Sequence, residues 1–340
     1  MHTESRTQHP KYTVARIEVP DNKVAWKQPF NHYIDFRPFY NHPDVETNLK
    51  LKKDDPKRWA ESHSITETDK ENLKSRITNI HGYPKTLEEA GIIFDGNNLP
   101  INPIGRTGLY GTGLLGKNGP NQAADPIFTR WAPPNTKPFY IAINNLKHIL
   151  TATYQNPVHL MIWELIKSLF YLLPHLQMIA IQRQDTRDWA IPGGMVEDGQ
   201  TVSQTLKNEI NEEACNNMDP NNASKEIDEI FNKNRGILIY RGYADDPRNV
   251  DTRWLETTAV HYHCESKLAA AIKLKAGDDA RKVMWLDMIP FDTRYYNLYA
   301  HHKRMTDKAM LQILIPYYVY NIIGPIIVFK LSNSLLAYFD

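Results

Sequence analysis

Three glutamates near the middle of the chain have a spacing that could hold a metal ion. Glu209, Glu212 and Glu213 follow a glycine pair at 193–194, on a segment whose apolar residues recur every fourth position: Val202, Leu206, Ile210 and Ala214. This recurrence predicts a helix that begins at 200–201. At about 100° per residue, the three carboxylates fall on one arc beside the apolar stripe and face the protein interior.

Such a cluster needs a compensating cation. Carboxylates beside an apolar face repel one another and lose hydration unless a positive charge balances them. Oxygen-only ligands suit hard divalent ions, with Mg²⁺ first and Mn²⁺ as the alternative. A bound ion could then activate water for attack on a phosphoanhydride. The helix taken alone is equally consistent with a solvated acidic face, which is what most glutamate runs are.

The loop before this helix makes the pattern specific. The stretch resembles the Nudix box of the Nudix hydrolases, Gly-x5-Glu-x7-Arg-Glu-U-x-Glu-Glu-x-Gly-U, where U is apolar. Gly194 matches the first glycine and 209–213 match the Glu-U-x-Glu-Glu core. The resemblance implies that Glu209, Glu212 and Glu213 are both metal ligands and catalytic carboxylates.

Four positions depart from that signature. Where it has Glu, Arg, Gly and an apolar residue, this chain has Gln200, Asn208, Cys215 and Asn216. A negative and a positive charge are lost together, so no lone charge is left if the two positions are close. We therefore expect a metal site whose surrounding support is weakened and whose activity is reduced.

A glycine-rich stretch at 102–131 is a second candidate for ligand binding. Glycines let the backbone approach a ligand and expose N–H groups to an anion. The spacing is not that of a P-loop, and a simple connector is the better explanation of the stretch taken alone. Its G-R-T-G-L, G-L-L-G and G-P-N-Q-A-A-D-P pieces resemble one Nudix subfamily, the mitochondrial-type ADP-ribose pyrophosphatases, which share their fold with a domain of an ADP-ribose-gated channel. The resemblance places Asp125 near the substrate and makes Arg106 and Arg130 candidates for phosphate or structural pairing.

Residues 240–257 carry a third cluster, Y-R-G-Y-A-D-D-P-R-N-V-D-T-R-W-L-E-T, which matches the same subfamily. Simple turn chemistry explains part of it. The resemblance implies that Asp246 and Arg248 bind substrate, the first through ribose hydroxyls and the second through a phosphate. Glu256 is a candidate fourth catalytic carboxylate. Both Glu213 and Glu256 are candidates for the general base.

A shorter element, Leu298-Tyr-Ala-His-His-Lys303, resembles the last substrate element of the subfamily. The resemblance implies that His302 approaches the phosphates or the terminal ribose and that Leu298 packs beside the substrate. We expect the neighbouring His301 to lie at the surface.

Composition narrows the class of protein and its surroundings. Lys plus Arg number 40 and Asp plus Glu 39 in 340 residues, so the net charge of +1 gives no support for nucleic-acid binding. The two cysteines form neither a metal-ligand spacing nor a disulfide framework, which fits a reducing compartment. The first 20 residues lack the apolar core of a secretory signal. We expect a cytoplasmic or mitochondrial protein that is not secreted.

Two apolar segments do not fit the resemblance. The first, at 149–174, contains an apolar helix candidate, and the second, at 313–329, has no charged residue but is broken by prolines and a glycine. Neither has the length and continuity that a bilayer requires, so we expect no membrane partner. We expect an accessory helix in the first segment and altered packing in the second. An error in the coding sequence is the alternative for both, and a tail anchor is a further alternative for the second.

Together these patterns predict an α/β protein, a Nudix α/β/α sandwich. Alternating apolar residues predict strands at 175–183, 237–243 and 257–263. We expect an N-terminal β-rich region at 1–139 that contributes to the substrate pocket, the Nudix domain at 140–312 with its apolar insertion, and an apolar tail at 313–340.

The implied reaction is Mg²⁺-dependent hydrolysis of ADP-ribose to AMP and ribose 5-phosphate by a monomer. The alternatives are an ADP-ribose-binding module with lost or weak catalysis, and a pyrophosphatase for another nucleoside diphosphate.

Overall fold

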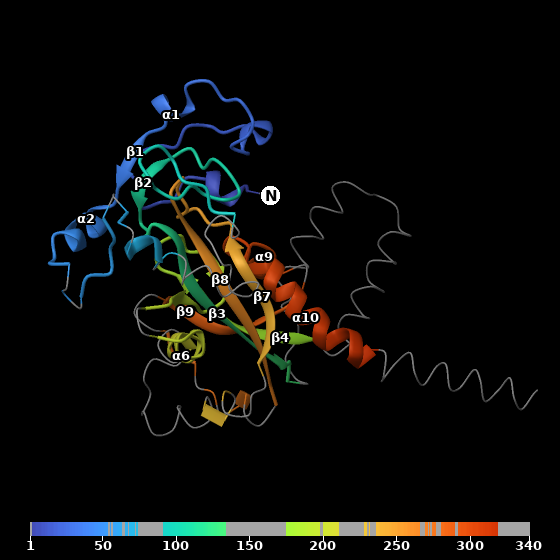
Figure 1. Cartoon of the computed structure of the whole chain (residues 1–340). Helices are drawn as coiled ribbons and strands as arrows, with labels where there is room; N and C mark the ends of the chain where they lie inside the picture. The colour runs from blue at the N-terminus through green and yellow to red at the C-terminus, as the bar shows by residue number, and fades with distance from the viewer. Residues whose placement is uncertain are drawn as a thin grey trace, which may run out of the picture.

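The computed structural model shows a sheet with helices on its faces and a largely irregular N-terminal region at one end (Figure 1). The residues that the structure describes are 2–53, 55, 57–62, 65–66, 68–71, 73, 91–133, 175–197, 200–210, 228–229, 231, 236–265, 269–270, 272, 274–276, 280–289 and 292–318. Glu212, Glu213, the apolar insertion and the tail beyond Tyr318 lie outside them. In the described part, no helix combines the length and apolar character that crossing a bilayer takes.

The sheet is mixed, and its central pair is parallel. Its order is β5-β4-β3-β8-β7, with β6 beside β3 and β9 beside β4. β3 pairs with β8 in parallel, while the other pairings in this sheet are antiparallel. The strands are β3 (Gly119–Trp131), β4 (Leu176–Arg183), β5 (Trp189–Ala190), β6 (Gly194–Met195), β7 (Ile237–Ala244), β8 (Arg253–Cys264) and β9 (Ala280–Asp287).

Three of these strands confirm the predicted ones. β4 and β7 match 175–183 and 237–243, and β8 begins four residues before the predicted 257, at Arg253. The sequence did not indicate β3, because Gly119, Pro120 and Pro126 favour a loop. As β3 lies at the centre of the sheet, the sheet starts at Gly119 and not near 140.

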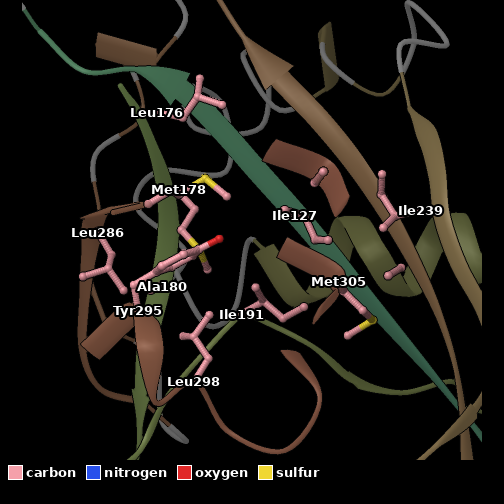
Figure 2. Packing of buried hydrophobic residues seen from close by; sticks show 13 residues of the cluster. Ile127, Leu176, Met178, Ala180, Ile191, Ile239, Leu286, Tyr295, Leu298 and Met305 are labelled. Carbon is pink, nitrogen blue, oxygen red and sulfur yellow. The ribbon is translucent and has the colours of Figure 1, made fainter. Parts of the chain in front are cut away.

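Helices cover both faces of this sheet. Ile127 of β3 packs with Met305 and Ala309 of α10 (His302–Tyr318), and Figure 2 shows Ile127, Ile191 and Met305 in one cluster. The adjacent Phe128 packs on the other face with Ile210, directly after α6 (Val202–Glu209). Since successive residues of a strand alternate between faces, Asp125 shares the α10 face with Ile127, and Gln122 lies on the α6 face.

The N-terminal region is not β-rich in the part that the structure describes. Before Gly119, its strands are the three-residue β1 (Phe39–Asn41) and the four-residue β2 (Tyr110–Gly113), which pair with each other. Two short helices of the region are α1 (Tyr33–Phe36) and α2 (Pro43–Leu49), and single 3₁₀ turns lie at Glu4–Arg6 and Asp21–Lys23. Its frequent prolines remove the N–H donors that a longer strand would need.

Side chain to backbone bonds hold this region together. The guanidinium of Arg106 donates to the carbonyl oxygens of residues 23, 25, 26 and 28 at 2.7–3.1 Å, which settles Arg106 as structural. Gly105 and Gly108 have φ values of 146° and 83°, and a Cβ at either would overlap a carbonyl of the N-terminal segment. These two glycines therefore permit chain-on-chain packing rather than anion binding.

Two carboxylates from the segment after β7 attach the region to the sheet. Asp251 is fully buried and accepts from Tyr33 Oη, Arg37 Nη1 and the Thr107 N–H at 2.8–3.0 Å. Asp245 accepts from the backbone N–H groups of residues 3–5 at 2.7–3.1 Å. The 240–257 cluster is thus partly a structural anchor, which its sequence did not reveal.

Candidate active site

A cleft of about 1070 Å³ is lined by the N-terminal region and by residues of β3, β4, β6, β7 and α6. Its lining includes only two carboxylates among the described residues, Asp185 and Glu197, against a larger number of cations. This excess of positive charge suits an anionic ligand such as a diphosphate. The cations are Lys11, Lys57, Arg58, Lys117, Arg183, Arg241 and Arg248.

The helix that carries Glu209 begins where the sequence predicts. Thr201 Oγ1 accepts from the Gln204 N–H at 3.2 Å, and Gln204 Oε1 accepts from the Thr201 N–H at 2.8 Å. This capping box fixes the start of α6. Gln200, which stands where the signature has Glu, accepts from Thr205 Oγ1 at 3.1 Å and donates to Glu197 at 2.9 Å. The neutral side chain therefore keeps the loop tied to the helix.

The glycine pair before α6 is matched to two carboxylates. A Cβ at Gly194 would overlap the carboxylate of Glu209, and a Cβ at Gly193 would overlap that of Asp125. Gly194 pairs with Ala124 on β3, so the half-buried Glu209 lies against the centre of the sheet and not in bulk water. Both glycines therefore permit a carboxylate to approach the backbone closely, and Gly194 is the one that matches the first glycine of the Nudix box.

Glu256 lies on the same face of the sheet as α6. It pairs in register with Gln122, and its carboxylate accepts from Gln122 Nε2 at 3.2 Å and Trp254 Nε1 at 3.1 Å. Glu209 and Glu256 thus contribute oxygens on one face beside β3, which fits a hard divalent ion. The described residues contain no complete metal-ligand group of three, and two of the predicted ligands, Glu212 and Glu213, are outside them.

Asp246 and Arg248 form a tight pair at the cleft. Arg248 donates from Nε and Nη2 to the two carboxylate oxygens of Asp246 at 2.8 and 2.9 Å. Burial acts to raise the pKa of Asp246, but the charge and hydrogen bonds of Arg248 outweigh it and leave that pKa well below its ordinary value. Arg248 lines the cleft, whereas Asp246 is buried beside it. This arrangement favours Arg248 as the phosphate contact and Asp246 as the group that orients it.

Comparison with known proteins matches this geometry to a family. The model described as "NUDT9-like, N-terminal domain" matches residues 19–119. The mitochondrial ADP-ribose pyrophosphatase of Rattus norvegicus is 36% identical over 310 residues, which is 89% of this chain and 76% of that protein. The chain belongs to the ADP-ribose pyrophosphatase family of Nudix hydrolases.

Two further relatives are similar to this chain over most of its length. A Caenorhabditis elegans protein whose name places it among the nudix hydrolases is 34% identical over 296 residues, covering 86% of this chain and 90% of its own length. A melastatin-type cation channel of Nematostella vectensis, named transient receptor potential cation channel subfamily M member-like 2, is 34% identical over 320 residues. The match covers 91% of this hydrolase but 18% of the channel, so the channel contains a related segment.

Arg183 is a cleft residue of this Nudix hydrolase that the sequence did not single out. It ends β4 and donates from Nε and Nη2 to Asp185 at 2.9 and 2.7 Å, with its Cζ 4.3 Å from the centre of the Tyr299 ring. Only its position at the end of a predicted strand, next to a loop, could have suggested a site role. The N-terminal residues His9 and Lys11 also line the cleft, without any sequence signal.

His302 and Asp125 support the glycine pair of the hydrolase from the α10 face. His302 Nδ1 accepts from the Ile191 N–H at 3.2 Å, and burial is the main cause of a pKa well below the usual value, so the ring is neutral. Asp125 accepts from Thr257 Oγ1 at 2.5 Å, and burial raises its pKa. Neither lines the cleft as the structure describes it. Direct substrate contact for these two residues stays a prediction; their observed role is positioning.

The structure also places three other residues that the sequence singled out. Leu298 packs in the core with Met305 and Ile191 and is 5% exposed, so its side chain does not face the cleft. Arg130 donates to Gln177 Oε1 at 2.9 Å and stacks over Trp285, so its role is structural. His301 is half-buried rather than at the surface, because its ring packs against Tyr240.

Proposed function

We propose that this Nudix hydrolase cleaves the diphosphate bridge of ADP-ribose to give AMP and ribose 5-phosphate, with Mg²⁺ as its cofactor. The observation that carries the proposal is the Glu209 carboxylate seated on Gly194 beside a cationic cleft. The 36% identical rat relative is named for this activity. Oxygen ligands on a hard divalent ion are the chemistry that the carboxylates provide.

In the proposed mechanism, Glu209, Glu212 and Glu213 would hold a divalent cation. When bound, this cation would supply charge neutralisation for the diphosphate and a lower pKa for the attacking water. Arg248, fixed by its two bonds to Asp246, stabilises negative charge on the phosphoryl oxygens. The Trp254 and Gln122 donors hold Glu256 in place, and Glu213 and Glu256 are the candidates to take the proton from water.

The test is release of AMP from ADP-ribose and Mg²⁺. We expect Glu209→Gln to lower kcat by at least about 100-fold, because one metal ligand loses its charge. Glu46→Gln, an exposed change on α2, is the matched control and should keep full activity. Equal turnover by Glu209→Gln and the parent would refute the metal site.

The second candidate function is an ADP-ribose-binding module without turnover. Two observations favour it: the uncharged Gln200 is committed to Glu197 and Thr205, and a channel contains a related segment. Binding of ADP-ribose without AMP release by the parent would support this candidate. In that case the double change Gln200→Glu/Asn208→Arg should create or raise turnover.

We also propose that the protein acts as a monomer in mitochondria. The rat relative is named as mitochondrial, which supports the location. Sedimentation of the purified protein and fractionation of cells that express it test the two statements separately.

A further inference from the structure

His9 comes from the N-terminal coil, before the matched family region begins at residue 19. It lines the cleft together with Arg183, Asp185 and Arg248, which lie far from it in sequence. Its side chain is only 1% exposed. The fold therefore brings a buried imidazole from the start of the chain to the cationic end of the candidate active site.

One hydrogen bond of the His9 ring shows which ring nitrogen carries the proton. Nδ1 accepts from the Lys11 N–H at 3.2 Å, so the neutral ring carries its proton on Nε2. Nε2 is buried and has no hydrogen-bond partner among the described residues. A buried donor without an acceptor is energetically unfavourable. Nε2 is therefore available to donate a hydrogen bond to an acceptor atom of a bound ligand.

The surrounding groups indicate which acceptor fits. The nearest carboxylate oxygen, Asp185 Oδ2, is 3.8 Å from Nε2, beyond hydrogen-bond distance, and Asp185 is already bonded to Arg183. Arg248 faces the same end of the cleft and is paired with Asp246. With each carboxylate committed to a guanidinium, an incoming anionic oxygen is the partner that Nε2 lacks.

Burial, the largest influence, lowers the pKa of His9 to about 4. The charges of Asp246 and Asp185 oppose this effect, while those of Arg248 and Arg183 add to it. The ring is therefore neutral at pH 7 and acts as a hydrogen-bond donor rather than as a cation.

We propose that His9 is a substrate-binding residue that donates from Nε2 to a phosphate oxygen of the diphosphate. The inference rests on the proposed function for the identity of the ligand. It assigns part of the substrate site to the N-terminal segment that precedes the matched domain. The rival interpretation is that His9 only packs beside Asp185 and Tyr12 as part of the N-terminal core.

The test compares His9→Ala, His9→Gln and the exposed control His32→Gln in the full chain. Calorimetry with ADP-ribose in EDTA measures binding without turnover, and AMP release with Mg²⁺ measures kcat and KM. For His9→Ala we expect Kd and KM to rise on the order of tenfold or more, as loss of one bond to a charged acceptor would cause, with a smaller change in kcat. His9→Gln, which retains a donor, should recover part of the affinity, and His32→Gln should match the parent.

Binding of AMP and of adenosine, which lacks the phosphate, shows which group of the ligand His9 contacts. If His9 contacts phosphate, His9→Ala should weaken AMP or ribose 5-phosphate and leave adenosine binding unchanged. An unchanged Kd for ADP-ribose in His9→Ala, with or without a lower melting temperature, would overturn the inference and favour the packing role. Binding by the parent without AMP release would refute the hydrolase alone, and the effect of His9→Ala on Kd would still decide the role of His9.

Discussion

Gly194 and Glu209 meet at a distance that only glycine permits. A methyl group at 194 would occupy the position of the Glu209 carboxylate, although the backbone there needs no positive φ. The sequence gives the spacing of the two residues, and the structure explains it as a steric requirement of the metal ligand. A substitution at 194 should therefore act on the carboxylate before it acts on the fold.

We expect Gly194→Ala to lower kcat by about 100-fold, because a shift of roughly 1 Å in a reacting group costs about that much. Gly96→Ala is the matched control, since a Cβ there meets nothing within 4 Å. AMP release and thermal melting should be measured on both. A Gly194→Ala variant with full activity would show that the carboxylate position is not restrictive.

The buried carboxylate of Asp125 lowers the stability of the protein at neutral pH. Burial raises its pKa above the unfolded value of about 3.9. Folding therefore favours the protonated form: the contribution to stability is full below about pH 4 and is lost as pH rises through the folded pKa.

Asp125→Asn keeps the shape and removes the charge, so we expect a higher free energy of unfolding than the parent at pH 7 and little difference at pH 3.5. Urea denaturation at the two pH values checks this. AMP release should fall in the same variant, because Asp125 contacts the glycine pair. Lower stability of Asp125→Asn at pH 7 would contradict the prediction.

At the scale of elements, the segment between β7 and β8 does two jobs. Arg248 faces the cleft, while Asp245 and Asp251 bind the N-terminal region. Arg253, at the start of β8, donates to the carbonyl oxygens of residues 115, 116 and 61 at 2.6–3.0 Å. This one segment therefore positions residues on both sides of the cleft. A substitution in the part that binds the N-terminal region should also affect substrate binding.

We expect Asp251→Ala to destabilise the protein by about 3–5 kcal/mol, since it leaves the Arg37 guanidinium without its buried partner. Asp35→Ala is the control: this exposed carboxylate lies on α1, and its loss should change stability by no more than about 0.5 kcal/mol. Urea midpoints measure both. A similar small effect for Asp251→Ala would mean that the anchor is dispensable.

Local patterns predicted the elements well where neighbours in sequence decide the structure. The fourfold recurrence of apolar residues from position 202 and the alternation in β4 are local signals, and both predicted elements are confirmed. For the glycine-rich stretch the local pattern leaves a connector and a ligand loop open, because its packing partners, near residues 17 and 24, are distant in sequence. For the same reason, nothing in the sequence pointed to His9 or Arg183.

The family resemblance indicated more of the candidate site than the local patterns did, but it did not distinguish cleft residues from core residues. It marked the segments around Glu209 and Arg248, which line or adjoin the cleft. It could not separate groups at the cleft from those that pack beneath it, such as Leu298 and His302, because a motif records sequence positions and not side-chain directions.

At the scale of the whole molecule, buried histidines link folding to pH. Burial, the largest influence in each case, lowers the pKa of His2, His9 and His261 to about 4. The folded state therefore holds these rings neutral, and the unfolded chain, with pKa values of about 6.5, binds protons first. Their contribution to stability is present above about pH 6.5 and is lost as pH falls toward 4.

We expect the urea midpoint to fall steeply between pH 6.5 and 4.5, with proton uptake on unfolding. His261→Gln should flatten this dependence, because it removes one of the titrating rings. Denaturation at several pH values, in two buffers of different ionisation heat, measures both quantities. A midpoint independent of pH in this range would contradict the assignment of neutral buried rings.

The parallel pairing of β3 with β8 also bears on how the chain is made. Gly119 pairs with Arg253 and Arg130 pairs with Cys264, so the central strand pair can form only after β8 has been synthesised. During synthesis on the ribosome, β3 therefore emerges long before its partner and stays unpaired while the intervening chain is translated. The first residues are in the same position, because Asp245, which binds residues 3–5, is translated much later. Release of the nascent chain before residue 264 should therefore yield a product that aggregates or is degraded, even when its N-terminal half has the correct sequence.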